Sequence, residues 1–412
     1  MEPMIERCCG LDVHQATVVA CVLIADGGRR PRREVRTFPT VTRSLLELKD
    51  WLEERGCTHV AMESTGIFWR PVYALLEGAF ELVVGNAQHM KNVPGRKTDV
   101  KDAEWIAELL RMGLIRKSFI PPPPIRELRD LMRYRRRVIE SRSNERNRLL
   151  KLLETANIKL SSVATDVFGK SGMAMLEALL KGDQQLENIA DLARGRMRTK
   201  KQALEAALDG RLQDHHRFML RLQLDRLRGV QEDLARIDDF VEQRLAPYRA
   251  QQLALTKIPG VGEHTAAVLI SEMGADMTVF HSAHHFAAWA GVAPGNNESA
   301  GKRLSGRARK GNPHLRATLV EAANAAIRTK GSYLNAKYYR LKARCGTARA
   351  MLAIAHKLAL AAFRVLATGA DYVDLGASFL DSLSGERTTR KLVKRLEGLG
   401  YTVSLEKPPA PA

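Results

Sequence analysis

The stretch that decides the N-terminal fold reads Cys9-Gly10-Leu11-Asp12-Val13-His14-Gln15-Ala16-Thr17-Val18-Val19-Ala20-Cys21-Val22-Leu23-Ile24-Ala25-Asp26. Two runs rich in apolar and β-branched residues flank a short polar turn at residues 14–16, and this pattern predicts a β-hairpin. Strand and helix patterns then alternate along the chain, with helices expected over 44–55, 71–77 and 99–112 and strands over 59–62 and 80–84. The alternation predicts an α/β domain over residues 1–120.

Four acidic residues stand at distinctive positions in this pattern. Asp12 lies within the first strand, and Glu63 ends a later one. Asp99 and Asp102 project from one face of a helix because they are spaced i, i+3. Carboxylates are the oxygen ligands that Mg²⁺ prefers, and a site for two such ions needs several of them. Each acid alone has an ordinary explanation, such as helix-dipole stabilisation by Asp99, but the set favours a metal site.

The balance of charge points to a polyanionic partner. The 412 residues include 65 lysines and arginines against 46 aspartates and glutamates, which gives a formal net charge of +19. Nucleic acid is the expected partner, and a membrane surface is the alternative. No apolar run approaches the roughly 20 residues that span a bilayer, and no signal peptide is recognisable. The five cysteines are odd in number and include no C-x-x-C pair, so we expect a reduced cytoplasm without structural zinc.

A four-proline spacer at residues 121–124 marks a domain boundary. Long amphipathic helices are expected over 125–155 and 212–245, and such a pair predicts an antiparallel hairpin or coiled coil used for dimerisation. The first helix carries an excess of arginines that either follow a nucleic-acid backbone or form a solvated face. Shorter helices are expected over 160–210, as an insertion within a helical region that spans 121–250.

The C-terminal region, residues 251–400, begins with a helix-hairpin-helix-like pattern, Ile258-Pro259-Gly260-Val261-Gly262. Its glycine turn opens a helix whose backbone N–H groups can contact a phosphate. Ser299 follows, within a segment rich in glycine and cations. This serine is either a nucleophile aimed at a phosphodiester or a turn residue in a solvated basic loop. Residues 401–412 are expected to form a tail.

The expected nucleic-acid contacts come from the glycine turn and from the basic segments of all three regions. They are Lys97, Lys101, Arg133, Arg136, Arg137, Gly260, Gly262, Lys302, Arg303, Arg307, Arg309 and Lys310. Cations that neutralise phosphates supply most of the sequence-independent affinity for nucleic acid.

Five segments in this order resemble the DEDD-type transposases of bacterial insertion sequences, the insertion-sequence one-ten family, also described as bridge-RNA-guided DNA recombinases. The segments are Gly10–His14, Ala61–Gly66, Lys97–Ala103, Ile258–Gly262 and Ala293–Lys302. The resemblance implies a RuvC-like N-terminal domain of RNase H fold, whose acids would be Asp12, Glu63, Asp99 and Asp102. It also implies a C-terminal transposase domain with Ser299 as nucleophile, and a structured noncoding RNA that pairs with donor and target DNA.

This resemblance leads to a hypothesis about the reaction. Ser299 attacks a phosphate to give a 5′-phosphoserine and a free 3′-hydroxyl, with about two Mg²⁺ ions held by the four acids. Because acids and serine are far apart in sequence, we expect a homodimer or homotetramer with a composite site, acting in the bacterial cytoplasm at the nucleoid. One alternative is a metal-dependent junction-resolving endonuclease that uses water as nucleophile. Another is a non-catalytic nucleic-acid scaffold.

Overall fold

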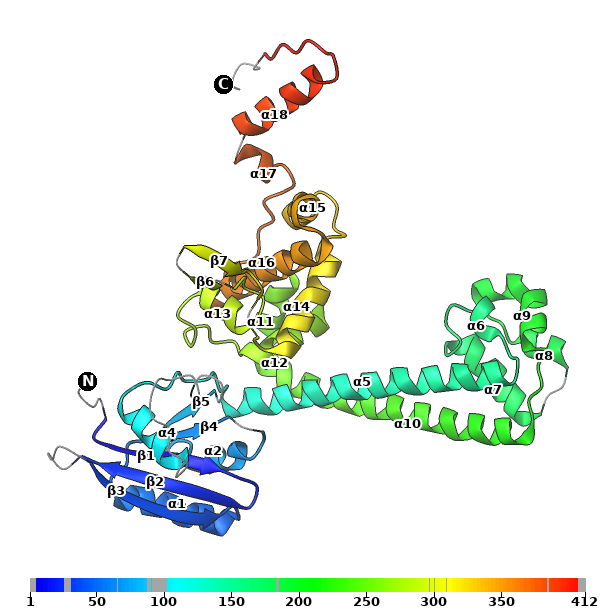
Figure 1. Ribbon diagram of the computed structural model, residues 1–412. Coiled ribbons are helices and arrows are strands. Elements are labelled where there is room, and N and C mark those ends of the chain that lie inside the picture. Colours follow the sequence, from blue (N-terminus) through cyan, green and yellow to red (C-terminus); the bar gives the residue numbers. More distant parts are fainter. Residues whose placement is uncertain are drawn as a thin grey trace. The chain divides into compact units, whose positions relative to one another are not determined.

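Figure 1 shows the computed structural model, which describes residues 5–25, 31–64, 66–86, 90, 102–182, 185–295, 297–299, 301–308, 310–383 and 385–406. At 297–299, 302–305, 386–388 and 391 it describes the backbone alone. The chain forms two compact units, Met1–Ile120 and Pro121–Ala412. Each unit contains its own buried apolar core.

The first unit is built on a five-stranded mixed sheet with the strand order β3-β2-β1-β4-β5. Its strands are β1 (Arg7–Val13), β2 (Thr17–Ile24), β3 (Arg32–Pro39), β4 (His59–Glu63) and β5 (Glu81–Gly85). The first three strands are antiparallel, whereas β4 runs parallel to β1 and β5 runs parallel to β4. This sheet and its helices confirm the predicted α/β character of the N-terminal region.

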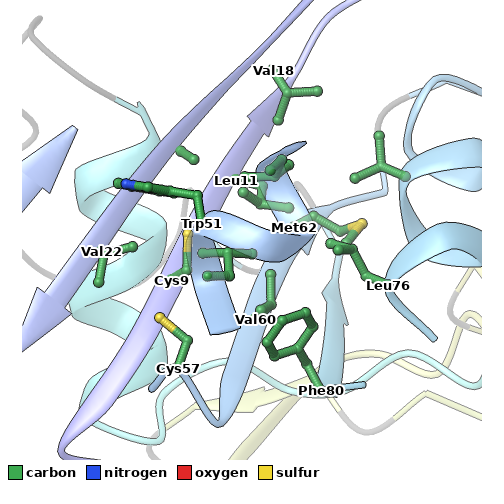
Figure 2. Close-up of a cluster of buried hydrophobic side chains, with 14 of the residues drawn as sticks. Cys9, Leu11, Val18, Val22, Trp51, Cys57, Val60, Met62, Leu76 and Phe80 are labelled. Atoms are coloured by element: carbon green, nitrogen blue, oxygen red, sulfur yellow. The ribbon is translucent and has the colours of Figure 1, made fainter. Parts of the chain in front are cut away.

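Helices cover both faces of this sheet. On one face, α1 (Thr42–Glu54) and α2 (Trp69–Leu76) share a buried cluster with Leu11 and Met62 of the central strands, as Figure 2 shows in part. On the other face, α4 (Asp102–Arg111) packs on alternate residues of the same strands. Strands buried on both faces read as continuous apolar runs, which explains why β2 consists almost entirely of apolar residues.

Strand β3 is absent from the sequence prediction. Its sequence is RREVRTFP, and most of its residues are exposed, with only Phe38 buried. Because β3 lies at the edge of the sheet, its polar side chains meet solvent, and its pairing with β2 stabilises it. The apolar alternation on which strand prediction depends is therefore missing.

The second unit begins with two long helices, α5 (Pro123–Thr155) and α10 (Asp214–Leu245), which run antiparallel along each other. The segment that joins them forms α6 (Leu160–Val163), α7 (Lys170–Lys181), α8 (Leu186–Asp191), a 3₁₀ turn (Gly195–Lys200) and α9 (Lys201–Leu208). These short helices share one buried cluster with the adjoining ends of α5 and α10. The segment between α5 and α10 is thus a small helical subdomain at one end of the helical pair.

The remainder of this unit is mainly helical, as predicted. Its elements are a 3₁₀ turn (Ala246–Tyr248), α11 (Arg249–Thr256), α12 (Glu263–Met273), α13 (Ala283–Trp289), β6 (Asn297–Ser299), β7 (Lys302–Ser305), α14 (Pro313–Ala326), α15 (Tyr333–Cys345), α16 (Thr347–Thr368), α17 (Phe379–Ser382) and α18 (Gly385–Glu397). Helix α16 is at its centre and packs against α11, α13, α14 and α15.

Helix α16 has the length and composition of a membrane span, and it is the only such helix among the described residues. From sequence, residues 349–367 are expected to form a core helix and not a membrane span, because Arg349, Lys357 and Arg364 interrupt its apolar residues. Its buried stripe, which includes Ile354, Leu358 and Val365, packs inside the unit. This burial is that of a core helix.

Candidate active site

Two of the predicted acids stand next to each other at one edge of the sheet. Strands β1 and β4 are parallel neighbours with Leu11 opposite Met62, so the next residues, Asp12 and Glu63, are side by side. Leu11 and Met62 belong to the core beneath α1 and α2. Because successive side chains of a strand alternate between faces, Asp12 and Glu63 both project toward the face that α4 covers.

Helix α4 approaches this face through Gly10. A Cβ atom on Gly10 would lie 2.3 Å from the carbonyl oxygen of Ala103 and 2.3 Å from the nitrogen of Ala107, so the helix backbone rests directly on the strand. Further back along β1, the Cys8 thiol donates to the Ala107 carbonyl oxygen at 3.7 Å. The helix therefore runs antiparallel to β1, and its first residue, Asp102, lies at the Asp12 end of the strand.

The structure thus brings three of the four predicted acids to one edge of the sheet. Asp12 and Glu63 are half-buried and Asp102 is exposed. Asp99 lies outside the described residues, as do Lys97 and Lys101. Within the described ranges no group of three or more histidine, cysteine, aspartate or glutamate side chains is close enough to hold a metal ion. The donor set, oxygen alone, nevertheless has the chemistry that Mg²⁺ requires.

His14 is a neighbour of this acidic edge that the sequence analysis did not include. Its Nε2 atom lies 3.0 Å from Oδ2 of Asp12, and the imidazole is largely exposed. A hydrogen bond of this kind orients a carboxylate, as the outer partners of metal ligands do. The i, i+2 spacing that places two side chains on one side of an extended chain could have indicated this pair from sequence.

Ser299 is the last residue of β6, in a short hairpin with β7. It pairs with Lys302, and Gly301 makes the turn between them with φ of 74°. The side chains of Ser299, Lys302 and Arg303 are not described, and Arg309 lies outside the described residues. The structure therefore places the backbone of the candidate nucleophile at the tip of a hairpin.

Two close backbone crossings hold the ends of this hairpin segment. A Cβ atom on Gly295 would lie 2.2 Å from the Arg307 carbonyl oxygen. A Cβ atom on Gly311 would lie 2.4 Å from the nitrogen of Gly291 and 2.5 Å from the carbonyl oxygen of Trp289. Only glycine fits at such crossings, and they fix where the hairpin leaves the helical body.

The glycines of the predicted helix-hairpin-helix-like turn have different surroundings. Gly260 has φ of 82°, and a Cβ atom on it would lie 2.2 Å from the carbonyl oxygen of Ala322, so it packs against α14. Gly262 precedes α12 and is exposed, and Glu263 occupies the first turn of that helix. Close packing is thus a sufficient reason for glycine at 260, while a phosphate contact at either position stays a prediction.

Comparison with known proteins identifies the chain. A model of IS110-type DEDD transposases, described as "Transposase", matches residues 9–158, and a second, described as "Transposase IS116/IS110/IS902 family", matches residues 252–340. The first spans the acidic edge and the second spans the serine hairpin. The chain belongs to the IS110 family of transposases. It is therefore an enzyme that cuts and recombines DNA.

Individual relatives carry matching names. The chain is 28% identical over 339 residues to "Putative transposase y4pF/y4sB" of Sinorhizobium fredii, which covers 80% of this chain and 78% of the relative. It is 24% identical over 287 residues to "Probable family 20 transposase" of Pseudomonas aeruginosa, and this match covers 68% of this chain and 75% of the relative. A shorter match, 33% over 127 residues, is to "Transposase for insertion sequence element IS1111A" of Coxiella burnetii, covering 29% of this chain and 35% of that one.

In this transposase a buried ionic cluster adjoins the end of the serine segment, which runs from Gly295 to Asn312 and includes the hairpin. The cluster consists of Glu272, Arg129, Arg133 and Asn312, and its Glu272 side chain is only 1% exposed. Nε of Arg133 donates to Oε1 of Glu272 at 2.7 Å, and a second Arg133 nitrogen donates to Oε2 at 2.8 Å. Nδ2 of Asn312 donates to Oε2 at 2.6 Å, and Arg129 donates to the Glu272 backbone carbonyl. The cluster joins α5, α12 and the start of α14.

Asn312 has a second role in this arrangement. Its Oδ1 accepts hydrogen bonds from the backbone nitrogens of His314 and Leu315 at 3.1 and 3.2 Å, which caps α14. Burial alone would raise the pKa of Glu272, but the ion pair with Arg133 and the hydrogen bond from Asn312 outweigh it, so the pKa lies below its ordinary value. Glu272 is absent from the residues predicted from sequence, because a single glutamate on an apolar helix gives no signal of its distant partners.

A cavity of about 270 Å³ lies beside this cluster, between α5, α12 and α14. Its arginines have acidic partners: Arg133 binds Glu272, Arg135 binds Asp238, and Arg136 lies 3.4 Å from Glu140. Burial and the nearby arginines lower the pKa values of His264 and His314, so both imidazoles are neutral at neutral pH.

The predicted nucleic-acid contacts on α5 therefore differ in their surroundings. The guanidinium of Arg133 is engaged inside the protein and that of Arg136 has a surface partner, whereas Arg137 is exposed. In the C-terminal region Arg307 and Lys310 are exposed next to the hairpin.

Proposed function

We propose that this IS110-family transposase exchanges DNA strands through a covalent 5′-phosphoserine at Ser299, aided by the acids of a RuvC-like N-terminal domain. The observation that carries the proposal is the acidic edge, where Asp12 and Glu63 lie side by side near the ends of neighbouring strands and Asp102 begins the helix that packs on the same face. Ser299 adds a hydroxyl group on a hairpin whose base is anchored at two glycines.

The reaction divides into two balanced steps. The Ser299 oxygen forms a bond to the scissile phosphorus, the bond from phosphorus to the 3′-oxygen breaks, and the serine proton ends on the departing 3′-hydroxyl. In the second step the 3′-hydroxyl of the partner strand attacks the phosphoserine and the serine regains a proton. One phosphoester bond replaces another in each step, so no external energy source is needed.

The acids would serve as the site of the metal ion. Asp12, Glu63, Asp99 and Asp102 would hold Mg²⁺, which when bound supplies positive charge that stabilises the oxyanions of phosphoryl transfer. His14 holds the Asp12 carboxylate in one orientation through its Nε2 atom. Cationic side chains of the serine segment, including Lys302, Arg303, Arg307, Arg309 and Lys310, would bind the phosphates of the DNA.

We further propose the domain roles and partners that the family resemblance implies. Residues 1–120 would be the acidic catalytic domain, 121–250 the helical dimerisation region and 251–400 the serine-bearing transposase domain. Exposed apolar side chains on α10, among them Phe218 and Leu222 at 69% and 49% exposure, support a homodimer or homotetramer. The formal net charge of +19 fits donor DNA, target DNA and a bridge RNA as partners.

A denaturing gel tests the covalent intermediate. Donor DNA labelled at its 3′ end is incubated with wild type, Ser299→Ala or Ser305→Ala, each loaded with the cognate noncoding RNA and Mg²⁺. We expect a labelled protein adduct with wild type and with Ser305→Ala, a matched change in the same hairpin, and none with Ser299→Ala.

Each alternative function predicts a different result. An endonuclease that activates water would cut DNA without any adduct and would keep cutting as Ser299→Ala. If the protein is a non-catalytic scaffold, the substitution Asp12→Ala should leave DNA processing unchanged. An undiminished adduct with Ser299→Ala would overturn the assignment of the nucleophile.

A further inference from the structure

We propose that a groove at the N-terminal end of α16 binds the phosphate backbone of the DNA strand that Ser299 attacks, a few nucleotides from the scissile phosphate. The groove, called the α16 groove below, lies between the segment that follows β7, helix α14 and the first turns of α16. Its volume is about 1120 Å³. This inference rests on the proposed function, because it takes the strand attacked by the serine as the ligand.

The charge of the α16 groove is unbalanced toward the positive. Arg307, Arg316 and Arg349 line it, and none of its described lining residues is acidic. The smaller cavity near Glu272 is the internal comparison, since its arginines are matched by glutamates and an aspartate. Because the described lining offers Arg316 and Arg349 and no carboxylate, it favours an anionic ligand.

The first turn of α16 adds to this preference. It contains no acidic residue, and the preceding Gly346 provides no side-chain cap. The first backbone N–H groups of a helix have no acceptor within the helix, and the helix dipole favours an anion there. The arginines and the helix end therefore act on the same ligand.

The size and lining of the α16 groove indicate a polymer rather than a small anion. The volume of about 1120 Å³ is much greater than a single phosphate ion would fill. Val320, Met351 and Leu352 form an apolar part of the lining. A nucleic-acid strand would place its phosphates on the arginines and its sugars on the apolar side chains, so it would fit both parts of the lining.

Two observations favour DNA over RNA in the α16 groove. The groove continues from the serine hairpin: Asn297 pairs with Ser305, and Gly306 follows directly. At about 3.3 Å per extended residue, Ser299 is roughly 15 Å from Arg307 along the hairpin. In addition, a ribose 2′-hydroxyl against the apolar side chains would lose its hydrogen bonds to water, whereas deoxyribose has no such group.

The test measures equilibrium binding by RNA-loaded transposase without any catalytic readout. The variants are Arg316→Gln with Arg349→Gln, the same pair changed to lysine, and Arg236→Gln, which removes an exposed arginine of α10. Fluorescence anisotropy reports the affinity for donor DNA at several salt concentrations, and the melting temperature of each variant reports folding.

We expect the double glutamine variant to bind donor DNA about tenfold more weakly near 0.15 M salt, with the salt slope reduced by about 1.5. Arg236→Gln should bind as wild type. The double lysine variant should retain most of the affinity, because a phosphate site needs charge more than a guanidinium shape. Equal binding by the glutamine variant and wild type would overturn the proposal, as would an equal loss with Arg236→Gln.

A photo-crosslinker at Met351 provides the second measurement and does not depend on the arginines. We expect crosslinks to the DNA strand that becomes attached to Ser299, within a few nucleotides of the attachment point. Crosslinks to the noncoding RNA alone would assign the α16 groove to RNA and overturn the proposal. If Ser299→Ala abolishes the adduct but leaves the crosslinks at Met351 unchanged, the serine supplies the nucleophile and the α16 groove binds DNA independently of it. If Ser299→Ala keeps the adduct while the double glutamine variant still loses DNA affinity, the proposed serine chemistry fails, although the α16 groove still binds DNA.

Discussion

Both carboxylate oxygens of Glu272 accept hydrogen bonds from one arginine, Arg133, at 2.7 and 2.8 Å, although 139 positions separate the two residues. This pair attaches the long helix α5 to the helices that flank the serine hairpin. Because Asn312 completes the cluster and also caps α14, a change at Glu272 would reach the residue at which the serine segment ends.

The first prediction concerns the stability of this cluster. Glu272→Gln removes the charge that compensates Arg133 while keeping the side-chain shape. Leaving one member of a buried ion pair without its partner costs about 3–5 kcal/mol, so we expect the free energy of unfolding to fall by that amount. Urea denaturation measures it. Glu140→Gln, which affects the half-exposed pair with Arg136, should change the same quantity by less than about 1 kcal/mol.

The second prediction concerns acid. The pKa of Glu272 in the folded chain lies below its ordinary value of 4.5. The resulting stability is fully present above the pKa of the unfolded chain and is lost as pH falls through the folded pKa. We therefore expect the difference in unfolding free energy between wild type and Glu272→Gln to be constant from pH 7 to about 5 and to shrink below about 4.5. A difference that stays constant into acid would contradict the ionised state of Glu272.

The third prediction concerns the contact between β1 and α4. In Gly10→Ala the new methyl group would overlap the backbone of Ala103 and Ala107, so α4 must move away from the strand. Overpacking of this kind costs about 1–3 kcal/mol, and it displaces Asp102 from the acidic edge. We expect lower stability together with reduced strand cutting. Gly229→Ala is the control, because nothing surrounds that helical glycine and alanine there should stabilise α10 by about 0.5–1 kcal/mol.

The fourth prediction concerns His14. In His14→Ala, Asp12 loses the hydrogen bond that orients its carboxylate, and loss of such an outer partner typically lowers metal affinity or activity by about 10–100-fold. Strand cutting at increasing Mg²⁺ concentrations measures the effect, which excess Mg²⁺ should partly restore. His59→Ala, at the opposite end of β4, should leave cutting unchanged. Equal strand cutting by His14→Ala and wild type would show that the hydrogen bond between His14 and Asp12 does not contribute to the site.

Local patterns were sufficient for much of the fold. The alternation of strands and helices in the first unit and the two long helices of the second are features of neighbouring residues, which sequence periodicity reports directly. Strand β3 escaped prediction because an edge strand with exposed polar side chains lacks the apolar alternation.

The candidate site divides in the same way. Asp12 and Glu63 are candidates from sequence, since each comes at a defined position in a strand, and Ser299 became the preferred candidate nucleophile only through the family resemblance; these roles stay predictions. Arg316 and Arg349, which line the proposed α16 groove, could not be selected from sequence, because isolated arginines are common on solvated helices.

By itself, the sequence determined the α/β and helical regions, the basic character of the protein and the order of its acids and serine. Only the tertiary structure decided that β1 and β4 are neighbours with Asp12 beside Glu63, that α4 rests on Gly10, and that Arg133 ends on Glu272. The physical reason is one of distance along the chain. Periodicity and turn chemistry act between residues a few positions apart, whereas these contacts depend on packing and burial between segments that meet only after folding.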